Sequence, residues 1–486
     1  MPKFVFLWTD VFIFCLVAGV LIYGFKVRRN VTLRATWAKV GHRPSAMCSV
    51  MVLGFFVLIG VLDSVHYQPL LPSVPGQSAA YSPTLRSVLD DVLSATQMAR
   101  AETTYSAPLA IRQFTKETEL IDGVAVRDFP RLKHAGTQLR SDADWHVDLV
   151  RRTLLGVAAG VAVGLAVGAL MLLAGRWRER HEQEASSSRV DGGAQVPWRA
   201  MWVTFVILAV LVGVVIALSL DYHVLGTDRT GNDVLRQGLK SVRTALVIGT
   251  LTVLAMLPPA LFFGIAAGYF RGWVDDVIQY VYTTMTSIPG VLLIAACVLM
   301  MQVYIDNNAS LFTTVAKRAD LRLFVLCLIL GLTGWAGLCR LLRAETMKLR
   351  EMEYVQAARA FGLGPWRIMR RHILPNVMHI IVITMVLEFS GLVLYEAVLS
   401  YLGIGVDPST PSYGTMIDAS RLEMSRDPMI WWNLLTAFMF LLALVLCANI
   451  LADAVQDAFD PRAQVFRTRR IGRRGKLRRV RQRGGL

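Results

Sequence analysis

The sequence predicts an all-α, polytopic membrane protein of about nine transmembrane helices. Of its 486 residues, 54% are hydrophobic and only 18% are charged, whereas a soluble globular chain carries about 25% charged residues. The mean hydropathy is +0.48. A helical span of the hydrocarbon core needs about 20 consecutive, mainly apolar residues, and the chain offers nine such stretches. These observations exclude collagen-like, disordered, disulfide-stabilised and ordinary cytosolic proteins.

The predicted spans follow the apolar stretches in chain order. They are 4–25, 46–62, 153–175, 200–220, 244–270, 277–301, 323–342, 377–400 and 429–452. The first stretch is too long for the apolar part of a signal peptide and lacks a small-residue cleavage site. It is followed by Lys26, Arg28 and Arg29, so we expect a retained anchor.

The distribution of Lys and Arg predicts the orientation, because cationic loops resist translocation. With the N-terminus outside and the C-terminus in the cytoplasm, the inside segments hold 29 Lys and Arg residues, eleven of them in the basic tail 461–486. The short outside segments 221–243, 302–322 and 401–428 hold four, three and two. The tail accounts for most of the formal net charge of +16. Its place beside the last span predicts contact with anionic membrane lipids and no nucleic-acid partner.

Residues 63–150 are numerous enough for a small domain outside the membrane. From residue 83 onward the segment has eight basic and ten acidic residues, so its charge is near neutral. Apolar side chains at helical spacing predict one amphipathic helix in it: Leu85, Val88, Leu89, Val92 and Leu93. Two interpretations stay open, a cover packed on its own membrane domain and a docking site for a partner.

The most informative segment is the predicted inside loop 344–376. Good helix formers at 351–360 predict a short helix, and the Gly-Leu-Gly-Pro sequence at 362–365 should end it. Residues 366–373 suit a second short helix before Leu374 and Pro375. Two short, Arg-bearing helices across a sharp turn would make a knob suited to docking.

This loop resembles the signature loop of ABC-importer permease subunits. That loop contains Glu-Ala-Ala, three residues, Gly, nine residues, Ile, one residue and Leu-Pro, and it sits in a groove of the ATPase. The matching positions here are Gln356, Ala357, Ala358, Gly362, His372, Leu374 and Pro375. Gln for Glu and His for Ile depart from the general pattern, although the peptide-transporter branch also has His there. The resemblance implies an ATPase-coupling role for these residues and for Glu353, Tyr354 and Arg359.

Further motifs resemble the C-type permease of the dipeptide/oligopeptide (peptide/nickel) transporter family. Residues 225–249 are similar to its LGTDxxGRDVLSRxxxGxRxSLxxG, with Asn232 in place of Arg. The resemblance continues through 268–276, 287–293, 399–406 and 408–416, where the usual PPTPSWG has become PSTPSYG, and it covers about 200 to 460. It implies an outer-face motif formed by Gly226, Thr227, Asp228, Gly231 and Asp233.

Side chains of the outer-face motif suggest how the next helix begins. Thr227, Asp228 and Asn232 are suited to cap a helix that begins near Asp233. By the family resemblance, we expect 234–242 to be an amphipathic helix lying along the membrane and supporting the outer gate.

The resemblance also implies the partners. We expect half of a heterodimeric pore completed by a second (B-type) permease, with ABC ATPase subunits and an extracytoplasmic substrate-binding protein, carrying short peptides across the bacterial cytoplasmic (inner) membrane. Nickel-chelate or modified-peptide cargo stays open. Residues 472–477 lack the spacing and the hydroxyl of a P-loop, so ATP should be bound by the partner ATPases. We expect no cofactor, metal site, catalytic residue or enzymatic activity in this chain.

Ionisable and proline residues inside spans are candidates for the pathway, because such groups are costly in a membrane. Glu388 and Glu396 lie eight residues apart on one predicted helix. For both, structural hydrogen bonding and pathway contact stay open. Pro258-Pro259 and the 287–290 stretch should kink or break their spans, and Pro289 is a possible pathway residue.

These observations divide the chain into five predicted parts. They are 1–62, two spans with a basic loop; 63–150, an extracytoplasmic segment; 151–199, an extra span with a polar linker at 181–197; 200–460, a permease core of six spans with the coupling loop 344–376; and 461–486, the tail. The role of 1–199 is left open. Alternatives from other classes are an ATP-independent secondary transporter or channel, and a receptor that binds partners through 63–150.

Overall fold

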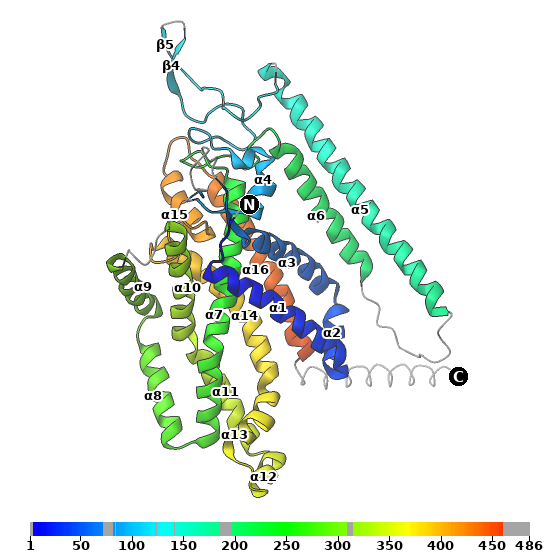
Figure 1. The fold of residues 1–486 in the computed structure, drawn as a ribbon, viewed down its shortest axis with the longest axis vertical. Coiled ribbons are helices and arrows are strands. Elements are labelled where there is room, and N and C mark those ends of the chain that lie inside the picture. The colour runs from blue at the N-terminus through cyan, green and yellow to red at the C-terminus, as the bar shows by residue number, and fades with distance from the viewer. Residues whose placement is uncertain are drawn as a thin grey trace, which may run out of the picture.

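The structure is a long bundle of helices with small strands at one end. The computed structural model describes residues 3–70, 81–82, 84–121, 124–139, 141–183, 197–308 and 314–459. The predicted tail 461–486 and most of the predicted linker lie outside these ranges. Figure 1 shows α4 and the β4–β5 hairpin at one end of the bundle and α12 at the other.

Helices dominate the described residues. The N-terminal ones are α1 Trp8–Arg29, α2 Val31–Gly41, α3 Pro44–Asp63, α4 Val88–Ser94, α5 Trp145–Gln183 and α6 Trp198–Ser219. The others are α7 Val234–Phe270, α8 Trp273–Ser287, α9 Gly290–Asn307, α10 Val315–Gly334, α11 Ala336–Arg350, α12 Glu353–Ala360, α13 Pro365–Ile368, α14 Leu374–Tyr401, α15 Tyr413–Glu423 and α16 Trp432–Phe459. Within the described residues, eight helical segments are long and apolar enough to cross a membrane, and the bent pair α10–α11 makes a ninth. The predicted fold class is confirmed.

Strands occupy short stretches of the N-terminal region. They are β1 Lys3–Phe4, β2 His66–Gln68, β3 Arg86–Ser87, β4 Glu117–Ile121 and β5 Val124–Asp128. The first three form an antiparallel sheet in the order β1-β2-β3, and β4 and β5 form a hairpin. The span predicted at roughly 4–25 is present as α1 but begins four residues later, at Trp8, because residues 3–4 pair with β2.

Two predicted helix boundaries in the core were also wrong. The predicted helix at 234–242 is the first part of α7, which runs for 37 residues. Pro258-Pro259, expected to kink or break this span, lie inside the continuous helix. The predicted second short helix is not separate either. From Pro365 the chain continues through a π-helical turn at 369–373 directly into α14. The wider turn fits Pro375, whose ring would clash with the carbonyl one regular turn earlier and which has no N–H to donate.

Two other predicted spans are interrupted. Residues 277–301 divide into α8 and α9 at Ile288-Pro289, as the proline predicted. The span predicted at 323–342 consists of α10 and α11, which meet at Trp335 with a bend of 41°. Of these two interruptions, the one at 287–290 was expected, whereas the bend at Trp335 has no proline to signal it.

Helices α5 and α6 pack closely because one face of α5 carries glycine at every fourth position. A Cβ on Gly156 would lie 2.7 Å from the Gly213 carbonyl oxygen, and one on Gly160 would lie 2.7 Å from the Ala209 carbonyl oxygen. Small residues at this spacing let helices approach within a membrane. Figure 1 shows the α5–α6 pair set to one side of the bundle.

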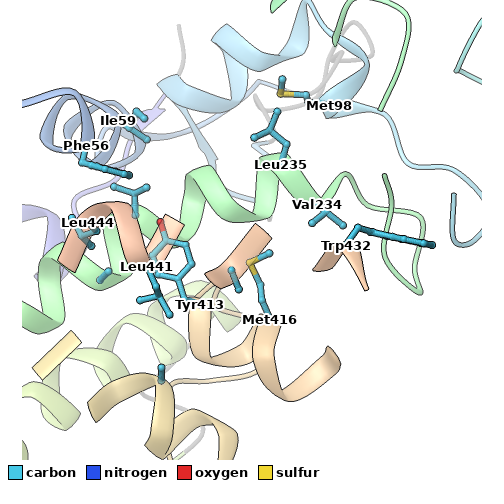
Figure 2. Close-up of a cluster of buried hydrophobic side chains, with 14 of the residues drawn as sticks. Phe56, Ile59, Met98, Val234, Leu235, Tyr413, Met416, Trp432, Leu441 and Leu444 are labelled. Carbon is cyan, nitrogen blue, oxygen red and sulfur yellow. The ribbon is translucent and has the colours of Figure 1, made fainter. Parts of the chain in front are cut away.

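The largest cluster of buried apolar side chains joins the 63–150 segment to the permease core. Figure 2 shows Phe56 and Ile59 from α3, Met98, and the first residues of α7 facing α15 and α16. Trp432 and Tyr413 are almost fully buried in this cluster. Burial of large aromatic groups contributes strongly to stability, so the N-terminal region and the core form one packed unit.

Candidate functional site

The coupling loop begins with α12, which ends in a glycine-dependent cap. Gly362 has a φ of +76°, and its N–H donates to the Arg359 carbonyl at 3.0 Å. The next N–H, of Leu363, donates to the Ala358 carbonyl at 3.2 Å. These two bonds form a Schellman motif, for which glycine is favoured because it has no Cβ. The predicted helix end at 362–365 is therefore present.

One face of α12 is packed and the other is exposed. Val355 and Ala358 are buried together with Ile368, Met369 and Ile373 of the following helical segment. The Tyr354 hydroxyl accepts a hydrogen bond from Asn376 Nδ2 at 3.1 Å. Figure 1 shows this hairpin as the end of the molecule farthest from α4. The turn is therefore held in a defined shape from within.

The exposed face of the hairpin carries large apolar groups that are unusual on a protein surface. Phe361 is 86% exposed and Trp366 is 62% exposed, on either side of the Gly362 turn. The predicted residues Glu353, Gln356, Ala357, Arg359 and Pro375 are exposed as well, while His372 and Leu374 are half-buried. An exposed apolar pair surrounded by polar residues is typical of a protein-binding surface.

The predicted outer-face motif forms a tight turn, which we call the α7 entry loop (residues 225–233). Asp228 Oδ1 accepts hydrogen bonds from the backbone N–H groups of Thr230 and Asn232, both at 2.8 Å. The helix cap is Asp233, whose Oδ1 accepts from the Arg236 N–H at 3.0 Å. The prediction that Thr227, Asp228 and Asn232 cap α7 was therefore wrong, since the latter two close the turn that precedes the cap.

Thr227 holds the entry loop against the 63–150 segment. Its Oγ1 donates to the Thr104 carbonyl at 2.8 Å, and its N–H donates to the Ser106 carbonyl at 3.1 Å. Gly226 and Gly231 both have positive φ angles, +73° and +77°. A Cβ at either glycine would collide with backbone of the 63–150 segment, at Ser106 and Glu102 respectively. Both glycines are therefore needed for the contact as well as for the turn.

A buried group of charges joins the same two segments. His223 Nδ1 lies 2.8 Å from Asp233 Oδ2, and its Nε2 lies 3.6 Å from Glu102 Oε1. The other contacts of the Glu102 carboxylate are the N–H groups of Lys133 at 2.9 Å and His134 at 2.8 Å. All three charged side chains are inaccessible to solvent or nearly so.

The pKa values of this group follow from its geometry. Burial lowers the pKa of His223, but the hydrogen bond to Asp233 and the charge of Glu102 outweigh burial and raise the pKa to about 9. Burial raises the pKa of Glu102, but His223 and the two backbone N–H groups outweigh burial and lower the pKa to about 2. At neutral pH, His223 therefore carries a positive charge between two carboxylates. Sequence reasoning missed Glu102 and His223, because nothing in the sequence relates residues so far apart.

The possible pathway residues occupy different environments. Glu396 is buried and accepts a hydrogen bond from Ser400 Oγ at 2.7 Å. Glu388, two turns earlier on α14, is exposed. Pro289 is exposed at the α8–α9 break, and a Cβ on the adjacent Gly290 would lie 3.7 Å from the Tyr395 hydroxyl. Among the described residues, no three His, Cys, Asp or Glu side chains are arranged to hold a metal ion.

Comparison with known proteins identifies the family. Residues 260–465 match the family described as binding-protein-dependent transport system inner membrane component. The oligopeptide transport system permease protein OppC of Mycobacterium tuberculosis is 31% identical over 245 residues, which are 50% of this chain and 78% of that protein. The chain belongs to this family. This permease is a multi-pass inner-membrane protein and the pore-forming subunit of an ABC importer, as the resemblance implied.

Other relatives of the permease match similar shares of the chain. The glutathione transport system permease protein GsiD of Pectobacterium atrosepticum is 28% identical, over 56% of this chain and 93% of that protein. The dipeptide transport system permease protein DppC of Lactococcus lactis is 28% identical, over 50% of this chain and 65% of that protein. A chain of the MetNI methionine ABC transporter has a TM-score of 0.35 and 18% identity, covering 47% of this chain and 96% of that chain. Membership implies a binding protein, an ATPase and a second permease as partners, and a transport role.

Proposed function

We propose that this permease imports short peptides, with α12 and the start of α13 docking in an ATPase subunit. The proposed docking surface is supported by the exposed side chains of Phe361 and Trp366, which lie on either side of the Gly362 turn. The peptide cargo is supported by relatives whose names specify oligopeptide, dipeptide and glutathione transport.

The rest of the assembly follows from this assignment. The end that carries α12 faces the cytoplasm, so the N-terminus and the 63–150 segment face outside, where a binding protein delivers peptide. A B-type permease completes the pore. Its contact would cover exposed α14 and α8–α9 surface, where Glu388 and Pro289 lie. Glu396, buried and hydrogen-bonded to Ser400 one turn later on the same helix, has a structural role within α14. We propose the same division of the chain into five parts, with boundaries after residues 62, 150, 199 and 460.

The experiment compares two glycine variants in cells that lack the native permease. Gly362→Asp places a side chain at a positive-φ turn in the proposed docking surface, and a Cβ there meets no atom within 4 Å. Gly272→Asp is the matched control, since Gly272 also has a positive φ of +57° and open space but lies in the α7–α8 turn. We measure uptake of a labelled dipeptide, recovery of the ATPase by affinity purification, and the amount of permease in the membrane.

Gly362→Asp should insert normally but lose both dipeptide uptake and the co-purified ATPase, whereas Gly272→Asp should retain both. Wild-type uptake by Gly362→Asp would refute the coupling assignment. If the wild-type permease co-purifies with the ATPase but does not import the labelled dipeptide, the proposed peptide cargo is refuted while the coupling assignment stands. Uptake that persists after ATP depletion would instead support the ATP-independent alternative.

A further inference from the structure

Helix α8 carries hydrogen-bonding side chains along one face, at a shallow open depression of about 430 Å³. We call the six residues that line it the α8 stripe: Asp276, Gln279, Tyr280, Thr283, Thr284 and Ser287. At 3.6 residues per turn, all six fall within about 140° of the helix circumference and follow the helix for about 16 Å. They therefore form one continuous polar surface.

The α8 stripe points away from the bundle. On the opposite side of α8, Ile278 and Tyr282 are buried in the apolar cluster that α8 shares with α7 and α11. A third face, about a third of a turn from the stripe, exposes the apolar residues Val277 and Val281. Figure 1 shows α8 at the edge of the bundle, next to the end of α7. The outer surface of α8 is therefore divided into a polar part and an apolar part.

Lipid is an unfavourable neighbour for this polar surface. Helix α8 is the first part of the interrupted span at 277–301 and packs against the second half of α7. Elsewhere polar groups pair between helices, as Asp10 of α1 does with Arg243 of α7 at 2.6 Å. Among the described residues, the side chains of the α8 stripe bond only within α8, where the Thr284 and Ser287 hydroxyls donate to backbone carbonyls at 2.8 and 2.7 Å. Polar side chains inside a membrane-spanning bundle normally face protein or a water-filled path.

The neutral residues of the α8 stripe are the informative ones. Asp276 lies in the first turn of α8, where the helix dipole stabilises a carboxylate whatever the surface faces. Tyr280 is 73% exposed and Thr283 is exposed as well, and neither has such a local reason to be polar. A hydroxyl can donate one hydrogen bond and accept two, so these groups suit contact with water or a polar ligand.

A polar face of α14 meets the far end of the α8 stripe. Three residues after Ser287, a Cβ on Gly290 would lie 3.7 Å from the Tyr395 hydroxyl of α14. Exposed Glu388 precedes Tyr395 by seven residues, which puts the two within about 20° on one face of α14. The exposed carboxylate of Glu388 therefore lies on the α14 face that borders the α8–α9 break.

We propose that the α8 stripe lines the path of the peptide between this permease and its B-type partner, and that its neutral groups hydrogen-bond the peptide backbone. The partner encloses this side of the bundle and contacts Val277 and Val281, while the stripe faces the enclosed channel. Backbone N–H and C=O groups are common to all peptides, so such a wall accepts short peptides with different side chains. The choice of a peptide rests on the proposed function, whereas a hydrated stripe rests on α8 itself.

The first test is thiol labelling of the assembled transporter. Thr283→Cys places a thiol in the α8 stripe, and Val281→Cys places one on the apolar exposed face as the matched control. Each variant replaces the native permease in cells, and inside-out membrane vesicles are treated with a methanethiosulfonate reagent that carries a quaternary ammonium group. Mass spectrometry locates the labelled residue, so the six native cysteines can stay in place. Unfolding in dodecyl sulfate should make both introduced thiols reactive.

The second test measures uptake of a labelled dipeptide by cells. Thr283→Val removes a hydroxyl from the α8 stripe at nearly constant volume. Thr286→Val is the matched control, because the Thr286 hydroxyl donates to the Tyr282 carbonyl at 2.9 Å and does not line the depression. Thr283→Val should lower the rate of uptake at low dipeptide concentration roughly fivefold, as expected for one lost hydrogen bond. Thr286→Val should transport like the wild type.

In the vesicles, Thr283→Cys should react about tenfold or more faster than Val281→Cys, because a permanently charged reagent does not enter lipid or a packed interface. Equal rates, or an unreactive Thr283→Cys, would overturn the proposal. Equal uptake by Thr283→Val and Thr286→Val would overturn the backbone contact. Dipeptide uptake by the wild type with an unreactive stripe would leave the importer assignment standing. A reactive stripe without dipeptide uptake in the wild type would leave the hydrated path standing and remove the peptide cargo.

Discussion

Replacing Glu102 by Gln should release the 63–150 segment from the α7 entry loop. The variant keeps the size of the side chain but removes the negative charge beside His223. It also has a single carbonyl oxygen for the two N–H groups, of Lys133 and His134, that now bond to the carboxylate. One of these buried donors must lose its acceptor.

The magnitude follows from the pKa of His223. The difference between 6.5 and about 9 corresponds to roughly 3 kcal/mol, at about 1.4 kcal/mol per pKa unit. Asp233 is closer to the ring than Glu102, so Glu102 supplies the smaller part, about 1 kcal/mol. The orphaned N–H adds about 1–3 kcal/mol. We expect a total loss of about 2–4 kcal/mol, which is roughly a 30- to 900-fold change in the opening equilibrium.

Hydrogen exchange measured by mass spectrometry on the detergent-solubilised permease reports this opening. Among the backbone bonds that join the segments are three in which the N–H groups of Glu102, Leu109 and Gly136 donate at 2.8–2.9 Å to carbonyls in 221–231. Their exchange should accelerate roughly 30- to 900-fold in Glu102→Gln. The control is Glu117→Gln, at an exposed position in β4. Equal protection in Glu102→Gln and Glu117→Gln would show that the buried charge group does not hold the segment.

Three further outcomes are expected. Raising the pH should loosen the same contact, because the pKa of His223 is about 9 in the folded chain and 6.5 in the unfolded chain. Protonated His223 therefore contributes its full stabilisation below pH 6.5 and loses it as the pH rises through about 9. Hydrogen exchange measured over a pH series and corrected for intrinsic rates tests this. Gly231→Ala should destabilise the contact by at least 1–3 kcal/mol, since it adds strain at positive φ and a collision with Glu102; unchanged exchange protection would contradict this. Gly160→Leu should separate α5 from α6 and lower the thermal midpoint, whereas Gly24→Leu, with open space around it, should leave the midpoint unchanged.

Features that depend on residues close together in the chain could be predicted from the sequence. The apolar stretches predicted the spans, and the Gly362 turn and the break at Pro289 followed from glycine and proline chemistry. The continuation of the helix through Pro375 was missed. A proline after a helical stretch is compatible both with a helix that ends and with a helix that continues through a wider π-helical turn. Helix propensities cannot decide between these two conformations, because the choice depends on the burial of Ile368 and Ile373 in the folded chain.

Contacts between residues far apart in the chain could not be predicted from the sequence. Glu102 is one of ten acidic residues in 83–150, and no spacing distinguishes it as the partner of His223. The same holds for Asp10 and Asp90, whose Arg partners follow more than 140 residues later. Asp233 was placed at the start of α7 correctly, but its neighbours were taken for the cap because several residues there have suitable side chains. Only the folded chain selects among them.

The ion pair between Asp10 and Arg243 has a consequence for synthesis of the protein. The two residues are 233 positions apart, and bacterial and eukaryotic ribosomes add about 5–20 residues per second. Asp10 is therefore synthesised roughly 10 to 50 s before Arg243. Of the basic groups that contact this carboxylate in the folded chain, only His66 is made early in that interval. Any factor that shields nascent α1 would act in this interval, and pausing translation before residue 243 would lengthen the exposure.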